Sequence, residues 1–207
     1  MRRQTHFSPL GNYVVGPDGI YLELGTPIFN ARFCTTKEIS SASWKSAQID
    51  HHDTEDDNVA PVFELKAPPP PAGLLEEAIG LFRTVMKIQY SKNNQCQISN
   101  DLIQREALAW MVYKEGVGWS LRVPKQTVSA YRVKSIPMTA DDKAGVILHS
   151  HGMLPAYFSE TDDLDEVDGF IYVVIGELHK EYPSIVMRAG YAGHFLDLNI
   201  NDVFHAK

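Results

Sequence analysis

Short runs of β-branched and aromatic residues, separated by turn residues, fill the first part of the chain. The runs at 12–15 and 20–24 flank the sequence Gly-Pro-Asp-Gly at 16–19, a combination typical of a tight turn between two antiparallel strands. Residues 27–41 continue the same pattern and are expected to extend this sheet. The stretch that follows, up to position 61, is polar and aperiodic and predicts a flexible acidic loop.

One helix stands out after a run of four prolines at 68–71. Successive prolines favour a stiff polyproline II conformation, typical of a spacer or of a loop lying over a surface. Beyond them, apolar residues recur at helical spacing on one face and predict a core-facing helix: Leu74, Leu75, Ala78, Leu81, Phe82, Val85 and Met86. We therefore divide the chain into a β-rich N-terminal extension, residues 1–70, and a second domain, residues 71–207.

The second domain mixes strands and helices without regular alternation. Its predicted strands are 106–115 and 118–133, joined at the Gly-flanked turn 115–118, then the buried strand 144–151, the continuous apolar strand 170–178 and two strands within 184–200. A helix is expected to begin at position 159. This pattern predicts the α+β (mixed α/β) class, with a sheet flanked by helices.

Composition and charge argue against several classes of function. Of the 207 residues, 44% are hydrophobic and 22% charged, which is ordinary for a globular protein, and the net charge is −7. This acidity argues against nucleic-acid binding, which needs clustered Lys and Arg. Cys34 and Cys96 lie far apart, so neither a disulfide framework nor a Cys-rich zinc finger is expected. With no signal peptide or membrane-spanning run in the pattern, we expect a cytoplasmic protein.

The candidate metal-binding residues are concentrated in the sequence HSHGMLPAYFSETDD at 149–163. Strand side chains alternate between faces, so His149 and His151 point the same way and can share a metal. Ser159 and Asp162 have the spacing of a helix start, which can turn Asp162 back towards the histidines. Two histidines, a carboxylate and one open position are typical of a catalytic zinc site. Either half of the pattern alone is more often structural: a surface imidazole pair, or a simple helix cap.

The full spacing, H-x-H followed by seven residues, then S-x-x-D, resembles the zinc signature of the JAMM (MPN+/Mov34) metallopeptidase family. The resemblance implies a JAMM/MPN, cytidine deaminase-like fold. It also implies Zn²⁺ held by His149, His151 and Asp162, with Ser159 hydrogen-bonding the oxyanion or the bound water. The zinc deaminases share this general architecture, but their own motif, H-x-E with P-C-x-x-C, is not found here.

The family also requires an upstream glutamate as general base. Glu106, in the sequence EALAWM, fits the family pattern, with Met111 in place of a leucine. Glu115 is a competing candidate but stands in a Gly-flanked turn, a poor position for a fixed base. Gly152 departs from the family, since many members have proline directly after the second histidine.

Over about residues 100–200 the sequence is also similar to a small bacterial subgroup, the PRTRC system protein A proteins. That similarity implies a ThiF-like adenylating protein as a possible partner. The resulting hypothesis is a zinc-dependent hydrolase of amide or isopeptide bonds, acting on a peptide or on the C-terminus of a ubiquitin-like or other small protein. The alternative is a non-catalytic binding or scaffold module for a ThiF-like partner. No nucleic-acid or membrane partner is expected.

Overall fold

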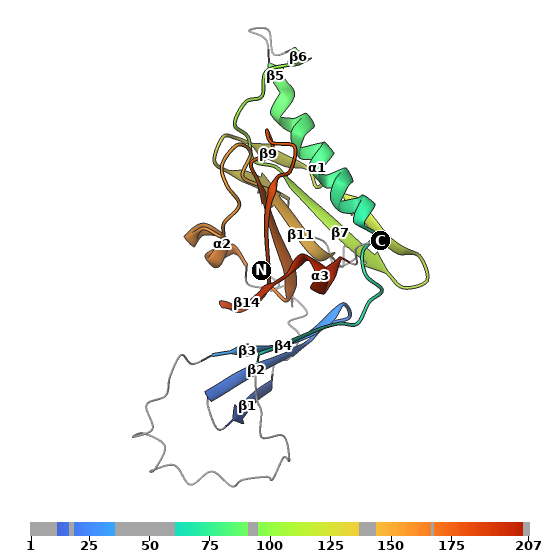
Figure 1. The fold of residues 1–207 in the computed structure, drawn as a ribbon, viewed down its shortest axis with the longest axis vertical. Helices are drawn as coiled ribbons and strands as arrows, with labels where there is room; N and C mark the ends of the chain where they lie inside the picture. The colour runs from blue at the N-terminus through green and yellow to red at the C-terminus, as the bar shows by residue number, and fades with distance from the viewer. Residues whose placement is uncertain are drawn as a thin grey trace, which may run out of the picture.

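The computed structural model describes residues 12–16, 19–35, 61–90, 95–136, 144–166 and 168–204. The predicted acidic loop lies almost entirely outside these residues. Within them, the chain forms a long six-stranded sheet, a four-stranded N-terminal sheet, two short two-stranded sheets and three helices (Figure 1). This is an α+β fold, as the sequence predicts.

The predicted metal-binding histidines lie at the end of a strand of the six-stranded sheet. Its strands lie in the order β14-β13-β12-β11-β7-β8. Only β11 and β12 run parallel to each other, and the other neighbours are antiparallel. The bounds are β7 (Leu108–Lys114), β8 (Gly118–Arg122), β11 (Ala144–Ser150), β12 (Phe170–Gly176), β13 (Ser184–Tyr191) and β14 (His194–Leu198). The apolar run at 170–178 is an internal strand because both of its edges are paired.

Helix α1 (Ala72–Lys87) confirms the predicted helix and begins directly after the prolines. Its buried residues belong to the predicted stripe: Leu75, Ala78, Phe82 and Met86. They join one core cluster with Val146 and Leu148 of β11, whereas Ile147 packs against Trp110 in a second cluster. Because strand side chains alternate, the cluster of Ile147 lies on the sheet face opposite α1. His149 and His151 continue the Ile147 series and share that face.

The N-terminal sheet has the strand order β1-β2-β3-β4 and is antiparallel throughout. Its strands are β1 (Asn12–Gly16), β2 (Gly19–Gly25), β3 (Phe29–Cys34) and β4 (Val62–Leu65). The predicted β1–β2 hairpin and its extension by β3 are confirmed. Phe29 and Phe33 belong to the same core cluster as α1 and β11, so the two sheets share apolar packing. The division at residue 70 stays a prediction.

The proline run lies against the six-stranded sheet. The indole Nε1 of Trp119, in β8, donates a hydrogen bond of 2.6 Å to the Pro68 carbonyl, and Pro70 is buried. An aromatic side chain that hydrogen-bonds a proline-rich backbone resembles the way polyproline II ligands are held between proteins. Here the contact is made within one chain, next to the start of α1.

The structure contains two short hairpins that the sequence pattern does not predict. The segment 118–133 divides, because β8 ends at Arg122 and residues after it form β9 (Gln126–Val128), paired with β10 (Val133–Ser135). Pro124, which has no N–H to donate to a ladder, lies at the break. The other hairpin, β5 (Ile88–Tyr90) and β6 (Cys96–Ile98), follows α1 directly, and a short helix α3 (Ile200–Val203) lies near the end of the chain.

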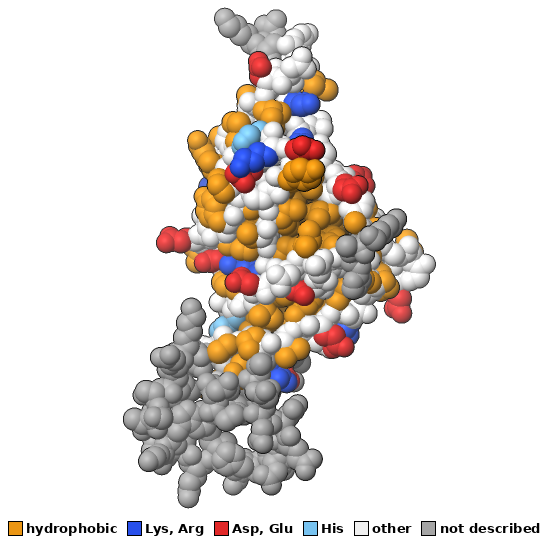
Figure 2. Space-filling model, viewed as in Figure 1, with side chains coloured by type: hydrophobic (Ala, Val, Ile, Leu, Met, Phe, Trp, Pro, Cys, Tyr) orange, Lys and Arg blue, Asp and Glu red, His pale blue; other side chains and the backbone are white. Residues whose placement is uncertain are grey.

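Figure 2 shows hydrophobic side chains reaching the surface across the middle of one face, between the N-terminal sheet and the β5–β6 tip. Cys34 and Cys96 are both exposed and are not joined in a disulfide. Among the described residues, none of the helices has the length and apolar character required to span a bilayer.

Candidate metal centre

The two histidines leave the end of β11 on one face, as their spacing predicts. The Nε2 atoms of His149 and His151 lie 3.2 Å apart. Ser150 points to the other face, where it is fully buried and its Oγ accepts a hydrogen bond of 2.9 Å from the Ala107 N–H. The His151 N–H donates to the Ile175 carbonyl of β12, which holds the backbone just beyond the strand end.

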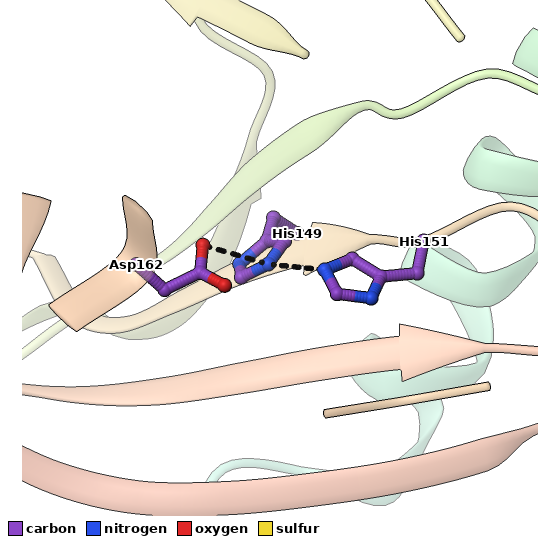
Figure 3. Close-up of side chains that lie close together, drawn as sticks. All are labelled: His149, His151 and Asp162. Atoms are coloured by element: carbon purple, nitrogen blue, oxygen red, sulfur yellow. Dashed lines mark hydrogen bonds and ion pairs between the residues drawn. The ribbon is translucent and has the colours of Figure 1, made fainter. Parts of the chain in front are cut away.

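Helix α2 (Glu160–Asp165) brings the carboxylate to the histidines. Ser159 caps the helix, and the Oδ2 atom of Asp162 accepts hydrogen bonds of 2.7 Å from both the N–H and the hydroxyl of Ser159. The other carboxylate oxygen, Oδ1, lies 3.3 Å from His149 Nε2 (Figure 3). The predicted capping box is therefore present, and it leaves one carboxylate oxygen directed at the imidazoles.

The three donor atoms form a group that can hold a metal ion. One ligand atom from each of His149, His151 and Asp162 lies within 4.8 Å of the other two. Both imidazoles present Nε2, and His151 Nδ1 lies 3.3 Å from the Pro155 carbonyl. Since a carbonyl only accepts, the proton of a neutral His151 lies on Nδ1, and its Nε2 keeps a lone pair. The donor set thus fits a cation of the kind that imidazole and carboxylate bind.

Burial keeps the imidazoles neutral. It lowers the pKa of His149 to about 4, a shift that the Asp162 charge only partly opposes. Burial likewise lowers the pKa of His151, with Asp162 and the Pro155 carbonyl acting in the opposite direction. A histidine must be deprotonated to bind a metal, so at neutral pH neither ring has to lose a charge first.

Glu106 lies close to this group, two residues before the start of β7, because its neighbour Ala107 is hydrogen-bonded to Ser150, which stands between the two histidines. Its N–H donates to the Ser129 carbonyl in the turn between β9 and β10. Burial, and then the charge of Asp162, raise the pKa of Glu106 to about 7. Glu115 is exposed in the turn after β7, at the opposite end of a seven-residue strand. At about 3.3 Å per residue, the strand separates the two glutamates by more than 20 Å.

The segment between His151 and Ser159 is held at its start by hydrogen bonds to Gln104. The Gln104 side chain donates to the His151 carbonyl and accepts from the Met153 N–H. Gly152 has φ +59°, and a Cβ there would come within 2.6 Å of Gln104 Oε1. Proline, whose φ is close to −65°, cannot adopt this conformation. The departure from the family pattern at Gly152 is therefore a different backbone turn.

Tyr157, in the same segment, lies beside His151. Its ring contacts the His151 ring edge to face at 4.6 Å between centroids, and the residue is about half exposed. The side chain thus forms part of the surface that a bound molecule would meet beside His151.

Sequence reasoning missed Arg188 and Gln104. Arg188 lies in β13, in the apolar sequence SIVMRAGY, yet it is buried and ion-paired with Asp163 and Glu166. A charged residue inside an apolar strand is a signal for such a partner, because a buried charge is costly unless it is paired. Gln104 lies in an irregular segment, and nothing in the residues around it indicates its contacts 47 and 49 positions away.

Residues 98–189 match the family described as Prok-JAB, prokaryotic homologs of the JAB domain. The match covers slightly less than half of the chain and runs from β6 into β13, so it includes the metal group and Glu106. It supports the resemblance of this part of the chain to the JAB/MPN family. A search of curated proteins found no match to the chain.

Proposed function

We propose that the chain is a zinc-dependent hydrolase of amide or isopeptide bonds. The observation that carries the proposal is the placement of one titratable carboxyl, Glu106, beside a group of two imidazoles and a carboxylate. His149, His151 and Asp162 would hold the metal. When bound, zinc polarises a carbonyl and lowers the pKa of water to about 7.

Glu106 is the proposed general base. A pKa of about 7 lets the carboxyl both accept and return a proton at neutral pH. Glu106 would take a proton from the attacking water and deliver it to the leaving amine. In the metal-free protein the negative charge of Asp162 also helps to keep the pKa of Glu106 high, and a bound cation would offset that charge.

The test compares two glutamate variants of the zinc-loaded protein. We expect Glu106→Gln to bind one equivalent of zinc and to lose at least 100-fold in peptide or isopeptide cleavage, the usual scale for a general base. Glu115→Gln is the matched control, since Glu115 is exposed and lies at the other end of β7, and it should retain full activity. Full activity of Glu106→Gln with zinc bound would exclude this residue as the base.

The substrate we propose is an extended C-terminal tail of a ubiquitin-like or other small protein. In support, the metal group lies at a strand end, beside the half-exposed ring of Tyr157, where an extended segment can approach. Incubation with small proteins encoded beside this one, followed by intact-mass measurement, would reveal a C-terminal truncation. The Glu106→Gln variant, incubated in parallel, should give no truncated product.

A scaffold function is the second candidate, in which the domain binds a partner such as a ThiF-like adenylating protein without catalysis. The exposed hydrophobic surface seen in Figure 2 favours some partner. Chelator treatment separates the two functions. A hydrolase loses activity when zinc is removed and regains it when zinc is restored, whereas a scaffold binds its partner equally well in both states.

A further inference from the structure

Helix α2 carries the ligand Asp162 but has almost no apolar packing of its own. It is six residues long, none of its residues is buried, and Leu164 is 77% exposed. A helix this short is not stable in isolation, and helices in proteins are normally fixed by an apolar face. Ser159 fixes the Asp162 side chain relative to the helix. It does not fix the helix relative to β11, where the histidines lie.

Arg188 of β13 supplies a rigid point on the sheet. Its guanidinium carbon lies 3.8 Å from the ring centroid of Phe158 and 3.7 Å from that of Phe195. Stacking between two aromatic rings holds the plane of the guanidinium, so only its edge is free to bond. The residue is 6% exposed. Phe158 directly precedes Ser159, so the stack also holds the chain where it enters α2.

That edge binds two carboxylates of the helix. Arg188 Nη2 donates to Asp163 Oδ1 and Nε donates to Glu166 Oε2, each at 2.7 Å. Asp163 directly follows the ligand Asp162, and Glu166 is the residue at which the helix ends. The Glu166 side chain is almost fully buried, so Arg188 contacts both the first turn and the end of α2.

We infer that Arg188 is a positioning residue: stacked between Phe158 and Phe195, it holds α2 on the sheet so that Asp162 faces His149. Its contribution to metal binding rests on the proposed function, whereas its contribution to the helix does not. Lysine is a poor replacement, because an ammonium group cannot stack between the two rings and bond both carboxylates in one plane.

The first experiment uses metal-free protein, so its result is independent of zinc. Hydrogen–deuterium exchange of a peptide spanning 158–166 is compared in wild type and Arg188→Met, with Arg32→Met as the matched control. Arg32 is also a strand arginine that bonds a carboxylate through Nε and Nη2, but its partner Glu23 is in the N-terminal sheet. We expect α2 to exchange at least about tenfold faster in Arg188→Met only.

The second experiment measures zinc affinity by competition with a chromophoric chelator. We expect Arg188→Met to weaken binding by about 10- to 100-fold, the range for residues that orient metal ligands. Arg188→Lys should be weakened nearly as much, and Arg32→Met should match wild type. Wild type that binds no zinc would refute the proposed function, and the exchange result would still decide the positioning role.

Two milder variants keep the inference testable if Arg188→Met fails to fold. Asp163→Asn and Glu166→Gln each weaken one of the two contacts and leave the guanidinium stacked, and each should speed exchange in α2. Wild-type exchange across 158–166 and wild-type zinc affinity in a folded Arg188 variant would overturn the inference. The same result in both milder variants would overturn it if no Arg188 variant folds.

Discussion

At the scale of single residues, the centre combines groups whose protonation states are set by burial. The imidazoles are kept neutral and able to bind a metal, while Glu106, with a pKa of about 7, is close to half-ionised at neutral pH. Such pairs of oppositely shifted groups are frequent at catalytic sites, and they are costly for folding. The cost is measurable because the folded and unfolded states bind protons differently.

Replacement of Glu106 by glutamine should stabilise the metal-free protein at high pH. The pKa of Glu106 is raised from 4.5 to about 7 on folding, so its contribution to stability is full below pH 4.5 and is lost as pH rises through 7. Glutamine has no charge to desolvate. We expect the free energy of unfolding of Glu106→Gln to be about 1–2 kcal/mol higher than that of wild type at pH 8, allowing for solvent screening. At pH 4 the two values should be equal.

Urea unfolding of both metal-free proteins at the two pH values measures this difference. Glu115→Gln serves as the control because its carboxyl is exposed. Equal stability of Glu106→Gln and wild type at pH 8 would mean that the carboxyl is solvated in the folded protein.

The Ser159 hydroxyl has two candidate roles, which are to orient Asp162 or to hydrogen-bond the oxyanion, and its contact with Asp162 favours the first. The hydroxyl donates to Asp162 Oδ2, so its proton is already used to orient the ligand. We expect Ser159→Ala to lower zinc affinity and to lose about 1 kcal/mol of stability, the usual cost of a lost helix cap. Zinc titration and thermal unfolding would measure these effects. A loss of kcat with zinc affinity unchanged would instead favour the oxyanion role implied by the family resemblance.

At the scale of secondary structure, the segment after His151 depends on an unusual backbone turn. Gly152 has a left-handed conformation and lies against Gln104. Gln104 in turn binds the Ala130 carbonyl beyond β9, so it links this segment to the β9–β10 hairpin. The position of His151 therefore depends on Gln104, which is 47 positions away in the sequence.

Replacing Gly152 by alanine should lower the free energy of unfolding more than the same replacement at another glycine with a left-handed conformation. Gly193 has φ +79°, and a Cβ added there would meet no atom within 4 Å, so Gly193→Ala measures backbone strain alone, about 1 kcal/mol. Gly152→Ala adds contacts with Gln104 and with the Arg105 carbonyl, and we expect a total of about 2–3 kcal/mol. Urea unfolding measures both variants. Equal costs would show that the neighbours of Gly152 move aside freely.

The sequence predicts those parts of the molecule that local periodicity determines. The helix at 72–87 and the same-face histidines follow from spacings of 3.6 and 2, and the Ser159–Asp162 pair follows from helix-cap chemistry. The β9–β10 sheet is missed because three-residue strands contain too little periodicity. The contacts of Gln104 and Arg188 depend on which strands become neighbours in space, which local pattern does not encode.

At the scale of the whole molecule, the two larger sheets share one apolar core. Phe29 and Phe33 of β3 are fully buried and belong to the cluster that contains Phe82 of α1 and Leu148 of β11. A sheet that folded independently would bury such residues among its own strands. Shared burial instead favours a single cooperative unfolding transition, in which the N-terminal sheet stabilises the strand that carries the histidines.

Truncation of Phe33 tests this coupling. Replacing a fully buried phenylalanine by alanine costs about 3–5 kcal/mol. In a single cooperative unit, that loss should shift the unfolding of the six-stranded sheet as much as that of the N-terminal sheet. The fluorescence of Trp110, in β7, reports the former, and far-UV circular dichroism reports the whole chain. Trp44 and Trp119 are first replaced by phenylalanine, the latter because its indole is hydrogen-bonded to Pro68 and would also report residues 1–70.

We expect both signals of Phe33→Ala to shift together to lower urea concentration. Zinc should protect both equally, because the ion binds only the folded state. Val62→Ala is the matched control, since Val62 is on β4 of the same sheet but half exposed, and it should shift neither signal by much. An unchanged tryptophan transition, with an early loss of part of the dichroism, would show that residues 1–70 unfold alone. That outcome would support the domain boundary predicted at the prolines, whereas coincident transitions would make the N-terminal sheet part of the unit that holds the metal centre.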